Sequence, residues 1–93
     1  WIERLFEDEK FVNKVKNRYK YFYDNMDIII EKVRTYSNQI EQSRINNESV
    51  WNILGKYVWP NYFIGNSFEE EQLYFENWIR ARMEWLNIEI NRL

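Results

Sequence analysis

The sequence predicts an all-α fold, a small helical bundle of two long antiparallel helices and shorter ones, with a long aromatic loop packed over them. Apolar residues recur at spacings of three and four over most of the 93 residues. Residues 49–66 lack this period and contain both glycines and the only proline. Aromatic residues make up 19% of the chain, and each such side chain can bury about 150 to 250 Å². A single core is therefore expected even in a chain of this length.

The first two helices are expected on either side of a break at residues 7–9. Residues 1–6 have helical spacing and predict a short helix. Asp8 is placed to accept backbone N–H groups at the start of the second helix. The apolar face of that helix consists of Phe11, Val12, Val15, Tyr19 and Phe22. Glu and Asp residues flank its lysines and arginines, which favours a solvated face over a phosphate-binding surface.

A third helix is expected after the break at Asp24 and Asn25. Its apolar positions are Ile29, Ile30, Val33, Tyr36 and Ile40. The β-branched run 28–30 suits a strand, but the flanking Glu, Lys, Arg and Gln residues continue a helical pattern. We expect about 20 residues of helix from Met26, ending near residues 44–47.

The last helix should begin at Phe68 and continue almost to Leu93. Ser67 and Glu70 have the spacing of a capping box, in which each side chain accepts a backbone N–H from the other residue. Residues 69–71 are all Glu, and the positive end of the helix dipole favours carboxylates there. One stripe of the helix carries Phe75, Ile79, Met83, Leu86, Ile90 and Leu93.

The composition excludes several classes of function. The chain has no Cys and no His, which excludes disulfides, thiolate nucleophiles, zinc-thiolate sites and histidine general bases. The formal charge of −2 gives no electrostatic case for binding nucleic acid or an anionic membrane. No run of about 18 apolar residues predicts a membrane span.

Two groups of aromatic residues are candidate ligand sites. In the loop, Tyr57, Trp59 and Tyr62 have flat faces that complement sugar rings. Nothing in the sequence aligns these rings, so packing against the last helix is the favoured interpretation. Trp51 is expected to join Tyr57 and Trp59 in bracing that helix.

The second group lies on the last helix. Trp78, Arg82 and Trp85 are spaced so that the guanidinium can lie between two indole rings. Such a cluster is either a ligand platform or a clasp that holds the last helix to the loop. We favour the clasp.

Three stretches of sequence resemble the C-terminal part of the CotH kinase family, which is named for a spore-coat protein. They are W-I-x-R-L-x-x-D-x-x-F-V-x-K-V at 1–15, W-x-I-L-G-x-Y-V-W-P-N at 51–61 and W-I-x-x-R-x-x-W-L at 78–86. The three occur in the expected order and together span nearly the whole chain. The stretch around Pro60 is the most specific of them.

The resemblance implies a larger parent protein, an atypical exported kinase that binds ATP with a divalent metal and phosphorylates Ser-rich spore-coat proteins. Relatives also occur in cell-surface and cellulosome-associated bacterial proteins. The family's nucleotide lysine, catalytic aspartate and metal-binding acids belong upstream, so we expect no catalytic residue, cofactor or metal site in this chain. Asp24 and Asp27 are better explained by the start of a helix than by metal binding.

Residues 1–93 are accordingly expected to form one helical subdomain, excised from the C-terminal part of such a kinase. Trp1 stands where a complete protein would have Met, and helical spacing starts at once. The expected role is structural and non-catalytic: support for the upstream kinase core of the same parent. The location implied by the resemblance is the bacterial cell surface or spore coat. Two alternatives remain, an autonomous recognition module for surface glycans or proteins that uses the aromatic loop, and self-association of the fragment.

Overall fold

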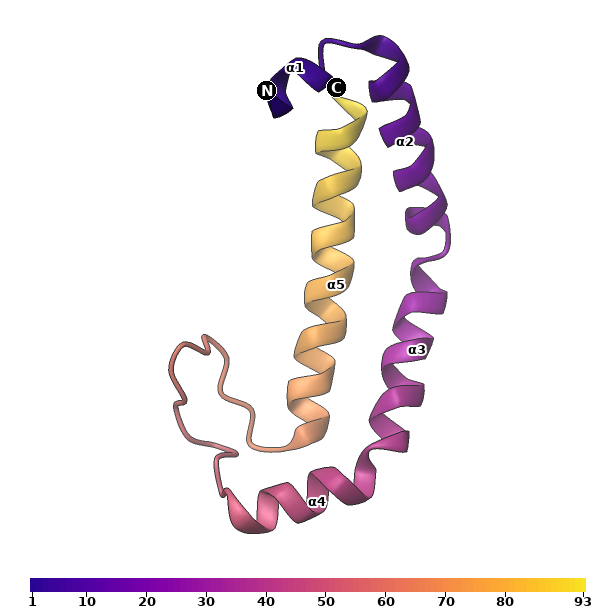
Figure 1. Ribbon diagram of the computed structural model, residues 1–93. Helices are drawn as coiled ribbons and strands as arrows, with labels where there is room; N and C mark the ends of the chain where they lie inside the picture. The colour runs from indigo at the N-terminus through magenta and orange to yellow at the C-terminus, as the bar shows by residue number, and fades with distance from the viewer.

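The chain folds entirely into helices and loops, as a computed structural model describing residues 1–93 shows. The helices are α1 (Ile2–Leu5), α2 (Glu9–Asp24), α3 (Met26–Gln39), α4 (Glu41–Val50) and α5 (Phe68–Asn91). In Figure 1, α2 and α3 follow one another along one side of α5 and run antiparallel to it, whereas α4 turns across the end of the pair. The two termini lie at the same end of the molecule. The predicted all-α class is confirmed.

The arm opposite α5 is formed by α2 and α3 with a single residue between them. The Asp8 carboxylate accepts a hydrogen bond from the Lys10 N–H at 2.9 Å, which confirms the predicted cap of α2. At the other end, the Asn25 side-chain amide donates to the Tyr21 carbonyl at 2.7 Å. Since only Asn25 separates the two helices, they act as one long partner for α5.

The third helix is shorter than expected. It ends at Gln39, and a separate helix, α4, follows after Ile40. The Thr35 hydroxyl donates to the Glu31 carbonyl at 3.0 Å, and the Ser37 hydroxyl donates to the Val33 carbonyl at 2.8 Å. Hydroxyl groups that bond to carbonyls one turn back compete with the helical ladder and bend helices. Two such bonds immediately precede the break.

The start of α5 confirms the predicted cap in part. The Ser67 hydroxyl accepts the Glu70 N–H at 3.2 Å. The Glu70 carboxylate, however, accepts the Asn66 N–H at 2.9 Å instead of the Ser67 N–H. The next carboxylate, that of Glu71, accepts the Gly65 N–H at 2.8 Å. The two glutamates therefore fix the end of the loop onto the first turn of α5.

The core of the molecule is small. Val12 and Ile30 are the only buried hydrophobic residues, and Ile30 is 1% exposed. Several polar contacts join the arm to α5: Tyr19 to the Met83 carbonyl, Tyr23 to Glu84, Asp27 to Arg80 and Arg34 to Glu76. The interface between the two arms is thus narrow and partly polar.

The surface of the chain is large for its mass. Its accessible area is 7952 Å², whereas a compact protein of 11.8 kDa exposes about 5,900 Å². Its radius of gyration is 18.0 Å, against about 12 Å for a compact domain of this length. The chain therefore has the secondary structure of a domain without the buried core of one.

Candidate functional site

The aromatic loop extends away from the helices, as Figure 1 shows. Exposed fractions are 63% for Tyr57, 80% for Trp59 and 100% for Tyr62. Trp51 is 64% exposed. Side chains this exposed do not brace α5, so the expectation that they do is wrong. The packing predicted between loop and helices occurs further along, at Phe63.

The base of the loop, in contrast, is held in place. The Phe63 ring stacks on the ring of Tyr74 in α5, with centroids 4.2 Å apart and parallel planes. The Gly55 N–H donates to the Gly65 carbonyl at 2.8 Å, which joins the two ends of the loop. Gly55 has a φ of +72°, a conformation that residues with a side chain rarely adopt. These contacts present the tip of the loop to solvent.

The tip itself forms a shallow hollow of about 290 Å³. It is lined by Tyr57, Trp59, Pro60, Asn61 and Tyr62. The Asn61 N–H donates to the Val58 carbonyl at 2.8 Å, which closes the turn. The hollow combines aromatic faces with one side-chain amide, and this composition suits stacking on a ring that also carries polar groups.

The cluster of Trp78, Arg82 and Trp85 is assembled only in part. The Arg82 guanidinium lies 4.4 Å from the centre of the Trp85 ring, a cation–π contact. No such contact joins Arg82 to Trp78. Trp78 is 53% exposed and Trp85 is 49% exposed, so about half of each indole faces solvent.

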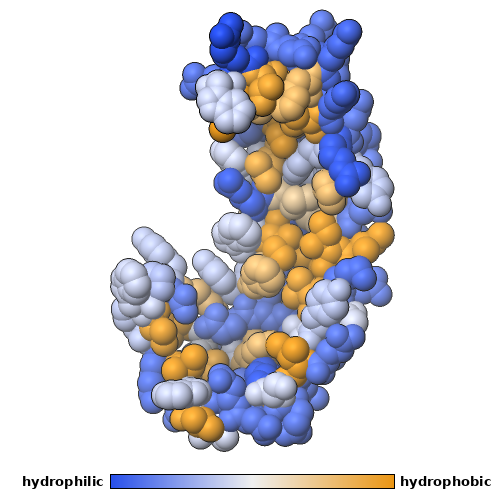
Figure 2. Space-filling model, viewed as in Figure 1, coloured by the Kyte–Doolittle hydropathy of each residue, from blue (hydrophilic) through white to orange (hydrophobic).

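These residues belong to a second apolar stripe that follows α5 on its solvent side. The stripe consists of Tyr74, Trp78, Trp85 and Ile88, which are 43% to 53% exposed. The other face of α5 packs against α2 and α3. Figure 2 shows off-white side chains at the edge of the upright part that faces the notch beside the loop, with orange side chains further in on the same face. A helix that is apolar on two faces is normally covered on both.

Polar groups between the arms form a network that the sequence did not reveal. Glu76 is 5% exposed and accepts hydrogen bonds from Arg34 at 3.1 and 2.8 Å. Gln72 donates to the same carboxylate at 3.0 Å. The bonds from Arg34, and then that from Gln72, lower the pKa of Glu76 below its ordinary value. Nothing in the sequence marks Arg34 and Glu76 as partners, because they lie on different helices.

Two tyrosines meet α5 near the other end of the molecule. Burial raises the pKa of Tyr19, and the nearby charge of Glu84 adds to this effect. Tyr23 donates to both carboxylate oxygens of Glu84 at 2.9 Å. This hydrogen bond is the main reason why the pKa of Tyr23 is raised. Both hydroxyls hold their protons in contacts between helices.

The two aspartates considered as metal ligands each form an ion pair. No three His, Cys, Asp or Glu residues gather where they could hold a metal ion. Asp24 pairs with Lys20 at 2.7 Å, whereas Asp27 pairs with Arg80 at 3.1 Å. The two carboxylates are thus engaged with cations on different helices. None of the five helices is long and apolar enough to cross a membrane.

Comparison with known proteins identifies the family. The model of the family described as CotH kinase protein matches residues 1–86. This range includes all three stretches on which the resemblance rested. No curated protein and no solved structure matches the chain. Since the family model covers nearly the whole sequence, the chain belongs to the CotH kinase family.

Proposed function

We propose that the chain is a non-catalytic helical subdomain of a CotH-like kinase, which packs against the kinase core of a longer parent chain and supports it. The observation that carries this proposal is the exposed apolar surface. The accessible area of 7952 Å² exceeds that of a compact protein by about 2,000 Å². A standard interface takes about 800 Å² from each partner, so the excess is large enough for an interface well above the standard size.

The surface that meets the core is the second stripe of α5. It runs along the longest helix and contains two of the five tryptophans, Trp78 and Trp85. Aromatic residues and Arg are enriched at the centres of interfaces, and Arg82 lies on the Trp85 ring within this stripe. The inner face of α5 packs against α2 and α3 within the subdomain. The outer face would pack against the kinase core.

The chemistry of the parent is assigned to residues outside this chain. We propose ATP and a divalent metal as cofactors of the parent, and the bacterial cell surface or spore coat as its location, as the resemblance to the family implies. The residues of this chain would contribute by holding the core in shape. Phosphoryl transfer depends on accurate positioning of its groups, and a subdomain packed against the kinase core would help to hold them in place.

A kinase assay tests the non-catalytic assignment. The isolated chain is mixed with radiolabelled ATP, Mg²⁺ or Mn²⁺ and a Ser-rich peptide. No transfer of label is expected, and a longer chain that includes the upstream region serves as the positive control. Transfer by the isolated chain that survives rigorous purification would contradict the proposal.

The supporting role has its own test in the longer chain. Trp78→Asp places a charge in the outer stripe and is expected to lower both the melting temperature and the activity of the longer chain. The matched control is Tyr62→Asp, because that side chain is fully exposed at the tip of the loop. Equal effects of the two changes would count against α5 as the surface that meets the core.

Exposure of the loop supports a second candidate function, a recognition module for surface glycans or proteins. Trp59 and Tyr62 are 80% and 100% exposed on a loop whose base is fixed. Glycan-array screening followed by calorimetric titration is the test. Binding that is lost in Trp59→Ala, with the helix content unchanged, would favour the module, and no binding to any glycan would remove the glycan form of this candidate.

A further inference from the structure

The hollow at the tip of the aromatic loop, which we call the tip hollow, has no charged side chain in its wall. The residues that line it are Tyr57, Trp59, Pro60, Asn61 and Tyr62. Between the end of α4 and the start of α5 the only charged residue is Lys56, and its ammonium donates to the Asn52 carbonyl at 2.8 Å. A ligand of the tip hollow is therefore selected by contacts with rings and by hydrogen bonds, and charge contributes little.

The tip hollow has hydrogen-bond donors that are free. The side-chain hydrogen bonds of the loop lie on either side of the tip, at Lys56 and at Gly65. The indole N–H of Trp59 and the side-chain amide of Asn61 have no partner within the protein, and the same is true of the two tyrosine hydroxyls. An indole N–H can only donate. The tip hollow thus suits a ligand that carries hydrogen-bond acceptors.

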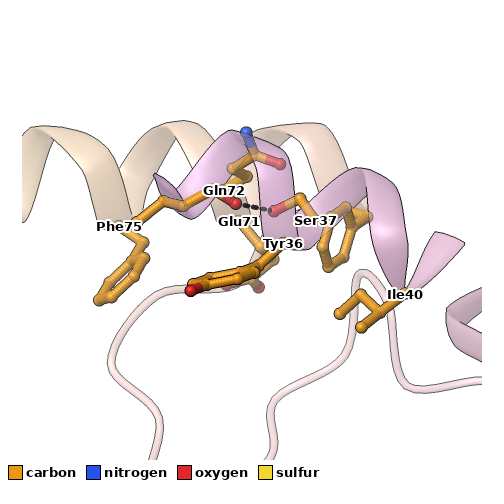
Figure 3. Close-up of a pocket in the computed structure, with 8 residues that line it drawn as sticks. Tyr36, Ser37, Ile40, Glu71, Gln72 and Phe75 are labelled. Atoms are coloured by element: carbon orange, nitrogen blue, oxygen red, sulfur yellow. Dashed lines mark hydrogen bonds between the residues drawn. The ribbon is translucent and has the colours of Figure 1, made fainter. Parts of the chain in front are cut away.

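The hollow between α3 and α5 differs in this respect. It has a volume of about 370 Å³, and Figure 3 shows the rings of Tyr36 and Phe75 at its opening. The Ser37 hydroxyl in its wall already donates to the Val33 carbonyl at 2.8 Å, as the dashed line marks. The Gln72 amide donates to a glutamate one turn further along α5 at 3.0 Å. Groups that are satisfied within the protein gain little from a polar ligand.

A proline-rich segment has the backbone that matches the free donors of the tip hollow. Proline has no backbone N–H, and a polyproline II helix has no internal hydrogen bonds, so its carbonyls remain free to accept. An α-helix, in contrast, uses its carbonyls internally. The hydroxyls of a sugar donate as well as accept, and each ring needs several polar partners. The donors at the tip therefore favour an extended, proline-rich backbone.

The rings of the tip hollow suit the ring of proline. Aromatic grooves are the usual binding surface for proline-rich segments. No ring contact joins Tyr57, Trp59 and Tyr62 to one another, so their faces are available to a ligand. The base of the loop is fixed by the stack of Phe63 on Tyr74. Because the loop is held in place, less conformational freedom is lost when a ligand binds.

We propose that the tip hollow binds a proline-rich segment of a protein partner in the polyproline II conformation. Pyrrolidine rings of the segment pack against the exposed aromatic rings, and its carbonyls accept hydrogen bonds from the Trp59 indole and the Asn61 amide. This inference rests on the second candidate function, for which it names the class of partner. It does not depend on contact between the outer stripe of α5 and a kinase core.

Two labelled synthetic peptides test the proposal on the 93-residue chain by fluorescence anisotropy. The first is decaproline, and the second is a Gly–Ser peptide of the same length, which has free carbonyls but a flexible backbone. Decaproline is expected to bind at least about tenfold more tightly. Added salt should leave this binding unchanged, since no charged side chain lines the tip hollow. Equal binding of the two peptides, or binding that high salt abolishes, would overturn the proposal.

Variants locate the binding surface. Trp59→Ala removes a ring and a donor and is expected to weaken decaproline binding at least about tenfold. Asn61→Asp keeps the shape of the side chain without its amide donor, and a loss of about twofold to tenfold is expected for one hydrogen bond. The matched control is Trp51→Ala, because Trp51 is 64% exposed but does not line the tip hollow. Circular dichroism checks that all variants keep their helix content. Unchanged binding in Trp59→Ala or Asn61→Asp, or an equal loss in Trp51→Ala, contradicts the proposal.

Glycan screening of the same chain separates this inference from the function on which it rests. A glycan whose binding depends on Trp59, with no binding of decaproline, would leave the second candidate function in place and overturn the inference. Absence of binding by decaproline and by every glycan would overturn both.

Discussion

At the scale of single residues, stability depends on very few side chains. Ile30 is 1% exposed, the most buried large side chain of the molecule. Ile30→Ala is expected to lower the free energy of unfolding by about 2 to 5 kcal/mol, because the buried methyl groups are lost and a cavity remains. Urea denaturation followed by circular dichroism measures the change.

The neighbouring isoleucine provides the control for this prediction. Ile28 has the same chemistry and lies on the same helix, but it is 52% exposed. Ile28→Ala should change stability by no more than about 0.5 kcal/mol. Equal effects at the two positions would show that α3 does not pack on α5 in the orientation described here.

Glu76 is expected to make the stability of the molecule depend on pH in the acid range. Its pKa is lower in the folded chain than in the unfolded chain, chiefly because of the hydrogen bonds from Arg34. The carboxylate therefore contributes stability that is fully present above the unfolded pKa and is lost as the pH falls through the lower, folded pKa. Glu76→Gln removes this dependence and should flatten the acid limb of a plot of stability against pH.

Urea midpoints measured from neutral pH down into the acid range test this prediction. Glu69→Gln is the matched control, since that carboxylate is 76% exposed. A stability curve that keeps the same slope at acid pH in Glu76→Gln would contradict the assignment of the ion pair between buried Glu76 and Arg34.

At the scale of helices, the sequence predicted the elements best where local chemistry decides their ends. Asp8 and Ser67 were identified as caps, and both accept the backbone N–H groups that such residues prefer. The break at Ile40 was missed because the apolar period continues through it and no Gly or Pro marks it. The hydroxyl bonds of Thr35 and Ser37 that precede the break depend on rotamers that a residue pattern does not show.

For the candidate site, the sequence predicted which residues matter but not where their side chains lie. Sequence identified the aromatic residues of the loop and of α5, but it assigned them to packing, since apolar side chains in a short chain usually form its core. The structure leaves Trp59 and Trp78 exposed. The pair of Arg34 and Glu76 could not be predicted, because it joins helices distant in sequence.

The cap of α5 gives a prediction at this scale. Ser67→Ala removes the acceptor of the Glu70 N–H and is expected to cost about 0.5 to 2 kcal/mol. Thermal unfolding monitored by circular dichroism measures it. Ser49→Ala is the control, since the Ser49 hydroxyl donates to the Asn46 carbonyl near the end of α4 and caps no helix start. A larger loss in Ser49→Ala would contradict this assignment of the cap.

At the scale of the whole molecule, the exposure of the tryptophans shows how much of the aromatic surface faces solvent. All five are exposed: Trp1 91%, Trp51 64%, Trp59 80%, Trp78 53% and Trp85 49%. The isolated monomer should therefore emit at the long wavelengths typical of tryptophan in water. A soluble quencher should reach every tryptophan, and the quenching plot should show no protected fraction.

The same measurement separates the proposed partners of the outer stripe, because each would cover a different set of tryptophans. In a longer chain that includes the kinase core, Trp78 and Trp85 should become protected while Trp59 stays accessible, as variants that keep one tryptophan at a time would show. Self-association of the isolated chain would instead protect Trp78 and Trp85 only as the concentration rises, in step with the mass measured by sedimentation. Protection of all five tryptophans in a dilute monomer would contradict the extended shape, in which a radius of gyration of 18.0 Å leaves the outer stripe in water.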